Sequence, residues 1–146
     1  MTHLRNGITI AMLLAGLAAA HAEEPLDMKG TWRPTVGAHL LDGPTRHHPS
    51  GVKTVPGQSR LKNNASTFTF TIDGQDGRAF WGSHGSSKVT ETLMGVLSVD
   101  GKRFVMVDED GRFDGVVVDA NSLDYCYAHI TATDRAVACG LLVRDH

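Results

Sequence analysis

The sequence predicts an all-β fold, an antiparallel up-and-down β-barrel of about eight strands. Between residues 91 and 144, short apolar runs alternate with Gly- and Asp-rich turns every eight to twelve residues, which is typical of a β meander. Residues 67–72 (TFTFTI) alternate strictly between polar and apolar side chains, as a half-buried strand does. Since closure removes the unpaired edges of an open sheet, a barrel is favoured over the alternative, a β-sandwich.

The N-terminal 22 residues have the pattern of a secretory signal peptide. Arg5 precedes an apolar run over residues 8–20, and the segment ends in Ala20-His21-Ala22. The run is shorter than the roughly 20 residues of a spanning helix, so we expect cleavage after Ala22 and no membrane span in the mature chain. The predicted location is secreted, in a bacterial periplasm, with residues 23–146 forming a single β-barrel domain.

The expected strands lie near residues 29–36, 66–72, 78–84, 89–98, 102–108, 112–118, 123–130 and 136–144. Residues 37–65 are rich in Gly, Pro, His, Ser and Lys, with several turn-forming pairs. We expect them to form a long loop with at most one short strand.

The two cysteines, Cys126 and Cys139, predict one intramolecular disulfide. An exported protein enters an oxidising compartment, which favours disulfide formation. If residues 131–134 form a hairpin loop closed by Ile130 and Arg135, paired residue numbers sum to 265, as 126 and 139 do. The two cysteines then face each other across the ladder, within disulfide distance.

Both faces of the meander are predicted to be apolar. Hairpins centred on Asp100-Gly101, Asp110-Gly111 and Ala120-Asn121 place one set of side chains together: Met94, Val96, Val105, Val107, Val116, Val118, Leu123, Tyr125 and Tyr127. The opposite set is Leu93, Leu97, Phe104, Met106, Phe113, Val117 and the cysteine pair. A barrel buries one face, so we expect the other to be covered, in a homo-oligomer rather than by residues 37–65.

Gly30-Thr31-Trp32 begins the first expected strand, and Arg144 ends the last. These residues resemble the Gly-x-Trp motif and the terminal arginine of calycin barrels, the superfamily of lipocalins and avidins. The resemblance implies a structural latch of Gly30, Trp32 and Arg144, with the arginine packed over the tryptophan at the closed end. The residues by which avidins hold biotin have no clear counterpart here, so biotin binding is not implied.

The function expected from this architecture is the binding of a small apolar or aromatic ligand in the barrel. Trp81, Tyr125, Tyr127 and His129 combine apolar bodies with polar tips, as ligand pockets do, although strand aromatics also serve as core. Small disulfide-bearing barrels of this kind also inhibit hydrolases, so a protein ligand is the alternative. The segment 82–85 (GSHG) lacks the spacing of a nucleophile elbow, and we expect neither catalysis nor a cofactor.

Four histidines raise a further alternative, a His-dependent metal-binding protein. His39, His47, His48 and His84 could supply imidazoles to Zn²⁺ or Cu²⁺, but the adjacent pair lacks the spacing of two ligands on one face. Residues 108–114 (DEDGRFD) lack the glycine and glutamate positions of an EF-hand. We therefore predict no metal site. The chain has 14 Lys and Arg against 16 Asp and Glu without a basic cluster, which excludes a nucleic-acid partner.

Overall fold

The computed structural model describes residues 24–42, 45–47, 60–61 and 68–145, and these residues form strands and turns without a helix. The predicted signal peptide, residues 1–22, lies outside this part of the chain. The strands are β1 (Gly30–Asp42), β2 (Arg60–Leu61), β3 (Thr69–Asp76), β4 (Ala79–Gly85), β5 (Thr90–Leu97), β6 (Arg103–Val107), β7 (Gly111–Asp119), β8 (Ser122–Ile130) and β9 (Arg135–Arg144). Within the described residues, no helix has the length and apolar character of a membrane span.

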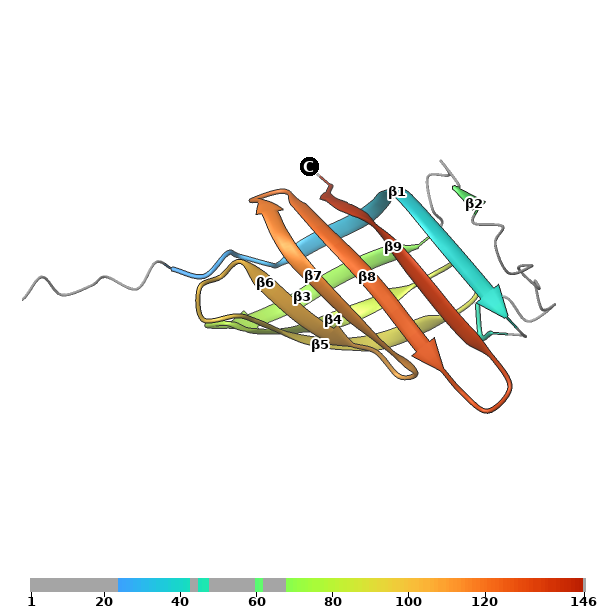
Figure 1. Ribbon diagram of the computed structural model, residues 1–146. Helices are drawn as coiled ribbons and strands as arrows, with labels where there is room; N and C mark the ends of the chain where they lie inside the picture. Colours follow the sequence, from blue (N-terminus) through green and yellow to red (C-terminus); the bar gives the residue numbers. More distant parts are fainter. Residues whose placement is uncertain (1–23, 43–44, 48–59, 62–67, 146) are drawn as a thin grey trace, which may run out of the picture.

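The predicted eight-stranded antiparallel barrel is confirmed. Strands β3 to β9 pair each with the next, β1 pairs with β3, and pairing of β1 with β9 closes the barrel (Figure 1). The short β2 pairs with β1 at Ala38 and His39, beside the closed ring. Closure leaves each of the eight barrel strands with a partner on both sides along at least part of its length.

Strand β1 continues to Asp42, well past residue 36, where we expected it to end. Its second half lies against β9, and the pairing reaches Asp42 opposite Arg135. Gly37 permits this approach, because a Cβ atom there would lie 2.8 Å from the carbonyl oxygen of Cys139. Gly37, part of the composition that suggested a loop, therefore permits close backbone packing at the barrel seam.

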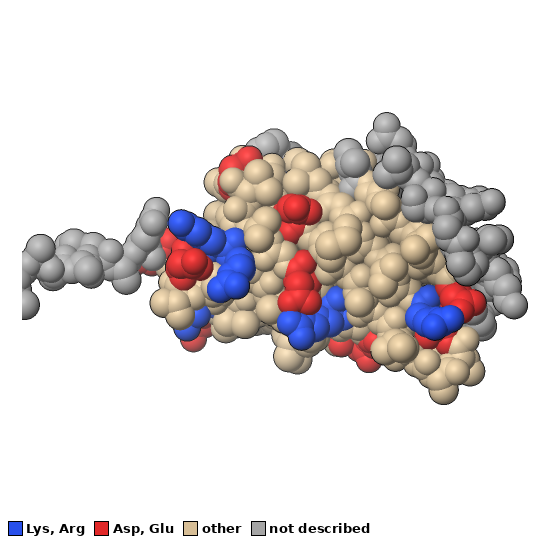
Figure 2. All heavy atoms as spheres, viewed as in Figure 1, with Lys and Arg blue, Asp and Glu red and all other residues tan. Residues whose placement is uncertain are grey.

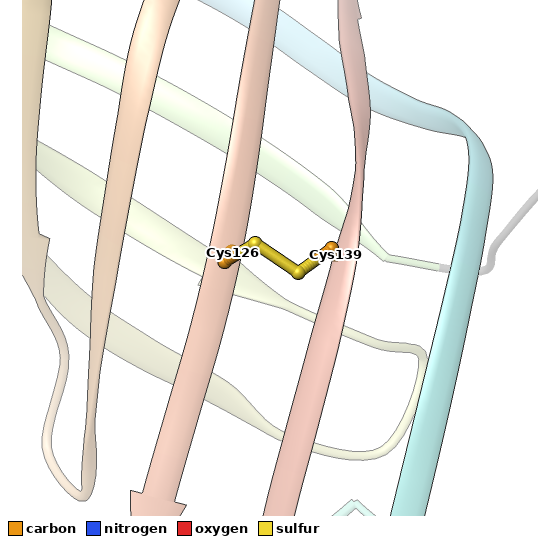
Figure 3. Close-up of a disulfide and its surroundings, with 2 residues drawn as sticks. All are labelled: Cys126 and Cys139. Atoms are coloured by element: carbon orange, nitrogen blue, oxygen red, sulfur yellow. A yellow bond between two sulfur atoms is a disulfide. The ribbon is translucent and has the colours of Figure 1, made fainter. Parts of the chain in front are cut away.

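The predicted disulfide is present and has the expected register. Cys126 lies directly opposite Cys139 in the β8–β9 ladder, and their Cα atoms are 4.0 Å apart. Figure 3 shows the bridge between the two neighbouring strands. Both residues are exposed, so the disulfide ties β8 to β9 from the outside of the barrel.

One part of the predicted face assignment is wrong. In β7, Val117 pairs with Leu123 and Asp119 with Ser122, so Val118 is an extra residue, a β-bulge. A one-residue shift exchanges the faces of every later residue. Leu123, Tyr125 and Tyr127 therefore point inward with the Phe113 set, while the disulfide lies outside.

The barrel core is made of large apolar side chains from the inward faces of all eight barrel strands, together with Met28, which precedes β1. Its buried members are Met28, Trp32, Phe70, Ile72, Phe80, Leu93, Leu97, Phe104, Met106, Phe113, Leu123, Tyr125 and Leu142. Each is 9% exposed or less, so these side chains fill the middle and one end of the interior.

The predicted latch closes that end. The Arg144 guanidinium lies 4.2 Å from the centre of the Trp32 ring. It also donates hydrogen bonds to the backbone carbonyl oxygens of Lys29, Asp27 and Ala120. Gly30 has φ +124°, which side-chain-bearing residues rarely adopt, and this conformation turns the chain into β1 beneath the arginine.

The outer surface over β4 to β7 carries exposed large apolar side chains: Trp81, Met94, Val96, Val105, Val107, Val116 and Val118. Figure 2 shows the outer surface from the side of β7, β8 and β9, where charged side chains form separate small groups on an otherwise uncharged face. A homo-oligomer that covers the apolar strip remains a prediction.

Replacing both cysteines by serine (C126S/C139S) should lower the free energy of unfolding by about 3 kcal/mol, because the unfolded chain loses a closed loop. Urea unfolding measures this difference, and reduced wild-type protein is the matched control because it should lose a similar amount. Equal stability of the oxidised wild type and the double variant would contradict a stabilising role for the bridge.

Arg144→Ala should lower the free energy of unfolding by about 2 kcal/mol, through the lost contact with Trp32 and the lost hydrogen bonds. Arg135→Ala, at the other end of β9, is the control. Its exposed ion pair with Asp42 should contribute about 0.5 kcal/mol or less. Equal losses for the two variants in chemical unfolding would contradict the latch.

Candidate functional site at the barrel mouth

The end of the barrel opposite the latch, which we call the mouth, contains buried polar side chains where the core ends. It is formed by the β4–β5, β6–β7 and β8–β9 turns and by Thr45–His47. Next to the core, three inward-facing positions carry polar side chains in place of apolar ones. They are His84 on β4, Glu91 on β5 and Asp108 after β6. His84 and Glu91 lie directly opposite each other in the β4–β5 ladder.

Glu91 lies at the centre of this group, and its side chain is 0% exposed. One carboxylate oxygen, Oε1, accepts a 2.7 Å hydrogen bond from Arg46 Nη1, which also contacts Glu109. The other, Oε2, lies 3.3 Å from His47 Nε2 and 3.6 Å from His84 Nε2. The buried carboxylate is therefore bounded by one half-exposed cation and two imidazole rings.

Asp108 and His84 form a close buried pair. The Nε2 atom of His84 lies 2.6 Å from Asp108 Oδ2. The other Asp108 oxygen, Oδ1, accepts hydrogen bonds from the backbone N–H groups of Asp110 and Gly111. Burial, with a smaller contribution from His47, lowers the His84 pKa to about 4, and burial raises the pKa of Asp108. The His84 ring is therefore uncharged near neutral pH.

A second polar network lies beside the first, on β8 and the β8–β9 turn. The Tyr127 hydroxyl donates a 2.9 Å hydrogen bond to Asp110 Oδ1 and lies 3.3 Å from His129 Nδ1. His129 Nε2 contacts Asp134 Oδ1. Hydrogen bonds from Thr131, Thr133 and His129 lower the Asp134 pKa, and burial raises the Tyr127 pKa. Tyr127 therefore stays protonated and acts as a donor here.

Aromatic rings form the floor under these polar groups. The Phe113 ring centre is 4.5 Å from Tyr127 and 6.0 Å from Tyr125, and Phe70 contacts Phe113 edge-on at 5.4 Å. His84 packs on the same group, with its ring centre 5.0 Å from Phe70. The mouth thus combines an apolar floor with a few polar groups that converge above it.

Two overlapping groups in the mouth have the composition of a cation site. His47, His84 and Glu91 each offer one ligand atom, and these atoms lie within 4.8 Å of one another. Glu91, Asp108 and Asp110 satisfy the same condition. Nitrogen and carboxylate donors at such separations can hold a divalent metal ion, and carboxylates so close together favour a cation or a shared proton between them.

Three of the four side chains predicted to bind a ligand lie on the inward face of β8. Tyr125 and His129 are buried and Tyr127 is half-buried. Trp81 does not join them, because it lies on the outer face of β4 at 49% exposure. There it covers Gly74, where a Cβ atom would lie 2.4 Å from the indole ring.

The structure brings two of the four candidate metal-binding histidines together. The rings of His47 and His84 stack with centres 5.7 Å apart. His39 lies on β1, outside both groups, and His48 lies outside the described residues.

Sequence reasoning missed the three carboxylates, Glu91, Asp108 and Asp110. The signal for two of them was available. Glu91 lies two residues before the buried Leu93, and Asp108 lies two residues after the buried Met106. Residues two apart on a strand share a face, so both carboxylates are expected to point inward. A charged residue at an inward position of a barrel strand is a candidate functional group, because burial without a partner is costly.

No known protein-family model and no curated protein matches this chain. Among solved structures, it is similar to an S-type phycobiliprotein lyase from Guillardia theta, with 10% sequence identity and a TM-score of 0.39. The similarity covers 82% of this chain and 89% of the other. Membership in the calycin superfamily remains a prediction.

The expectation that this chain is not an enzyme is contradicted by that comparison. The matching protein is described as a lyase. The likeness assigns no reaction to this chain.

In the absence of metal, Glu91→Gln should raise the free energy of unfolding by about 1 kcal/mol, because an amide of the same shape replaces a buried carboxylate beside two others and can still accept a hydrogen bond from Arg46. Urea unfolding in the presence of EDTA measures this change. Glu109→Gln, which removes the charge of the exposed partner of Arg46, should leave the free energy of unfolding close to that of the wild type. A large loss of stability in the Glu91 variant would mean that its contact with Arg46 supports the fold.

Proposed function

We propose that the protein binds a small organic ligand at the barrel mouth, with the apolar or aromatic part of the ligand on the ring floor and its donor groups on the carboxylates above. One observation carries the proposal. Polar groups converge over an aromatic surface at one end of the barrel, while the other end is filled and latched. Apolar walls with a few oriented polar groups are the usual composition of a small-molecule site.

The position of the ligand follows from the packing. Towards the latch, the interior is occupied by side chains such as Leu97, Phe104 and Leu123, each 2% exposed or less. A ligand among them would have to displace well-packed core, at a cost in stability. The mouth is different because its polar tips, including Tyr127 and Asp110, are only partly buried. The ligand therefore lies above the core.

The chemistry of the mouth selects hydrogen-bond donors. Asp110 and Asp134, whose side chains are 19% and 11% exposed, carry the carboxylate oxygens nearest the surface of the mouth, and these accept hydrogen bonds when ionised. A planar ligand with an amine or hydroxyl group would satisfy these acceptors and stack on the floor made by Phe113 and Tyr127. Such a ligand would be met outside the cytoplasm if the predicted signal peptide directs export.

A fluorescent aromatic amine, N-phenyl-1-naphthylamine, tests this proposal. Tyr127→Ala should weaken its binding at least fivefold, because a ring that forms part of the floor and its hydroxyl group are both removed. Trp81→Ala removes a larger ring from the outer face and should change the affinity less than twofold. Fluorescence titration measures both, and thermal unfolding verifies that each variant is folded.

Equal affinity of the wild type and the Tyr127 variant would refute binding at the mouth, and so would a loss confined to the Trp81 variant. Native mass spectrometry of the protein purified from its own host then identifies a co-purifying molecule, whose donor groups and planarity can be compared with the proposal.

A further inference from the structure

The structure assigns to the mouth a site for a divalent transition-metal ion, with His47, His84 and Glu91 as protein ligands and Asp108 beside them. This inference concerns a metal and goes beyond the organic ligand proposed above. It does not depend on that ligand, because the atoms involved are the imidazole nitrogens and the inner oxygen of Glu91.

The spacing of the donor atoms fits a tetrahedral ion. Bonds of about 2.0–2.1 Å from zinc to nitrogen and oxygen place neighbouring ligand atoms roughly 3.4 Å apart. Glu91 Oε2 lies 3.3 Å from His47 Nε2 and 3.6 Å from His84 Nε2, so two edges of the tetrahedron are already close to this value. The third, between the two nitrogens, is within 4.8 Å. To complete the site, His84 Nε2 must also give up its 2.6 Å contact with Asp108 Oδ2.

The electrostatics of the cluster favour a cation. The side chains of Glu91 and Asp108 are both 0% exposed, and Asp110, at 19%, completes the acidic group. Like charges this close destabilise one another unless a proton or a cation lies among them. Arg46 contacts Glu91 from the outer side, through Oε1, and is itself half-exposed. The inner oxygen, Oε2, faces the imidazoles.

His84 is oriented into the same cluster. Its side chain is 4% exposed, and its Nε2 atom points at Glu91 and Asp108. The other ring nitrogen, Nδ1, has no hydrogen-bond partner among the residues that the structure describes, so no acceptor there holds the ring proton. Nε2 can bind a metal when the ring proton resides on Nδ1, and the metal then replaces the 2.6 Å contact of Nε2 with Asp108 Oδ2.

The donor set selects the class of metal. Two imidazoles and one carboxylate are the ligands of several zinc sites, and the same set binds cobalt and other first-row ions. Calcium and magnesium prefer sites built from oxygen atoms alone. With three protein ligands, a fourth position remains for Asp108, water or a donor atom of a bound molecule.

The competing explanation is a purely structural ion-pair cluster in which Arg46 compensates Glu91 and no metal is needed. The two explanations differ in the effect of Glu109, the second carboxylate on Arg46. If the cluster is purely structural, removal of either carboxylate partner of Arg46 should disturb it. If it is a metal site, only the loss of one of the three ligands should abolish metal binding.

Isothermal titration calorimetry of the full chain, produced without a histidine tag and stripped with EDTA, tests the site. We expect one Zn²⁺ per chain with a dissociation constant of about 1 µM or tighter, and Co²⁺ should give visible absorption bands typical of four-coordination. Ca²⁺ at the same concentrations should not bind measurably.

Glu91→Gln and His84→Gln should each weaken Zn²⁺ binding at least 100-fold and abolish the cobalt bands. Glu109→Gln and His39→Gln are the matched controls, an acid and a histidine outside the ligand group, and should change the affinity less than threefold. Thermal unfolding in EDTA confirms that the variants fold. Adding Zn²⁺ should raise the midpoint of the wild type and of both controls but not of the ligand variants.

Failure of the wild type to bind Zn²⁺ or Co²⁺ at 1 mM would overturn the inference, and so would ligand variants that bind like the wild type. These outcomes leave the organic-ligand proposal intact, because the aromatic amine titration is performed with EDTA present.

Discussion

The pairing of β1 with β9 is the constraint on which the rest of the structure depends. The ladder runs from Trp32 opposite Arg144 to Asp42 opposite Arg135 and joins the two ends of the sheet. Without this closure, the inward faces of the strands would be exposed to water, and Glu91 and His84 would be ordinary solvated side chains. The burial that makes the mouth unusual is therefore a consequence of the seam and of the Trp32–Arg144 contact at its start.

Much of the fold could be predicted because it follows from local patterns. Strict alternation identified the strands, Asp-Gly pairs identified turns, and one register sum placed Cys126 opposite Cys139. Two features could not be predicted in this way. The bulge at Val118 has no distinctive residue type, since valine fits any strand position. The extension of β1 to Asp42 depends on contact with the distant β9, which the composition of residues 37–42 does not reveal.

The candidate site was harder to predict than the fold, because its parts come from different strands. Tyr125, Tyr127 and His129 were found through their aromatic character, and His47 and His84 through their residue type. Their partners were missed, although Glu91 and Asp108 occupy inward positions next to apolar neighbours. Asp108 was placed at the end of an expected strand, in a segment rejected as an EF-hand, but it closes the turn by accepting hydrogen bonds from two backbone N–H groups and also contacts His84. A residue with two roles is easily assigned the simpler one.

The bulge at Val118 has a consequence for how this sequence can change over evolutionary time. Because Val118 is an extra residue, every residue after it faces the opposite side of the sheet from the one it would face if Val118 were paired in a regular ladder. Deleting Val118 itself would leave Val117 opposite Leu123 in a regular ladder, with Tyr125 and Tyr127 still inside, whereas a single deletion within β8 would turn such side chains outward. Other insertions and deletions in β7 or β8 should therefore survive in related sequences only as compensating pairs, whereas the turns at the latch end, which carry none of the carboxylates of the mouth, are freer to vary in length.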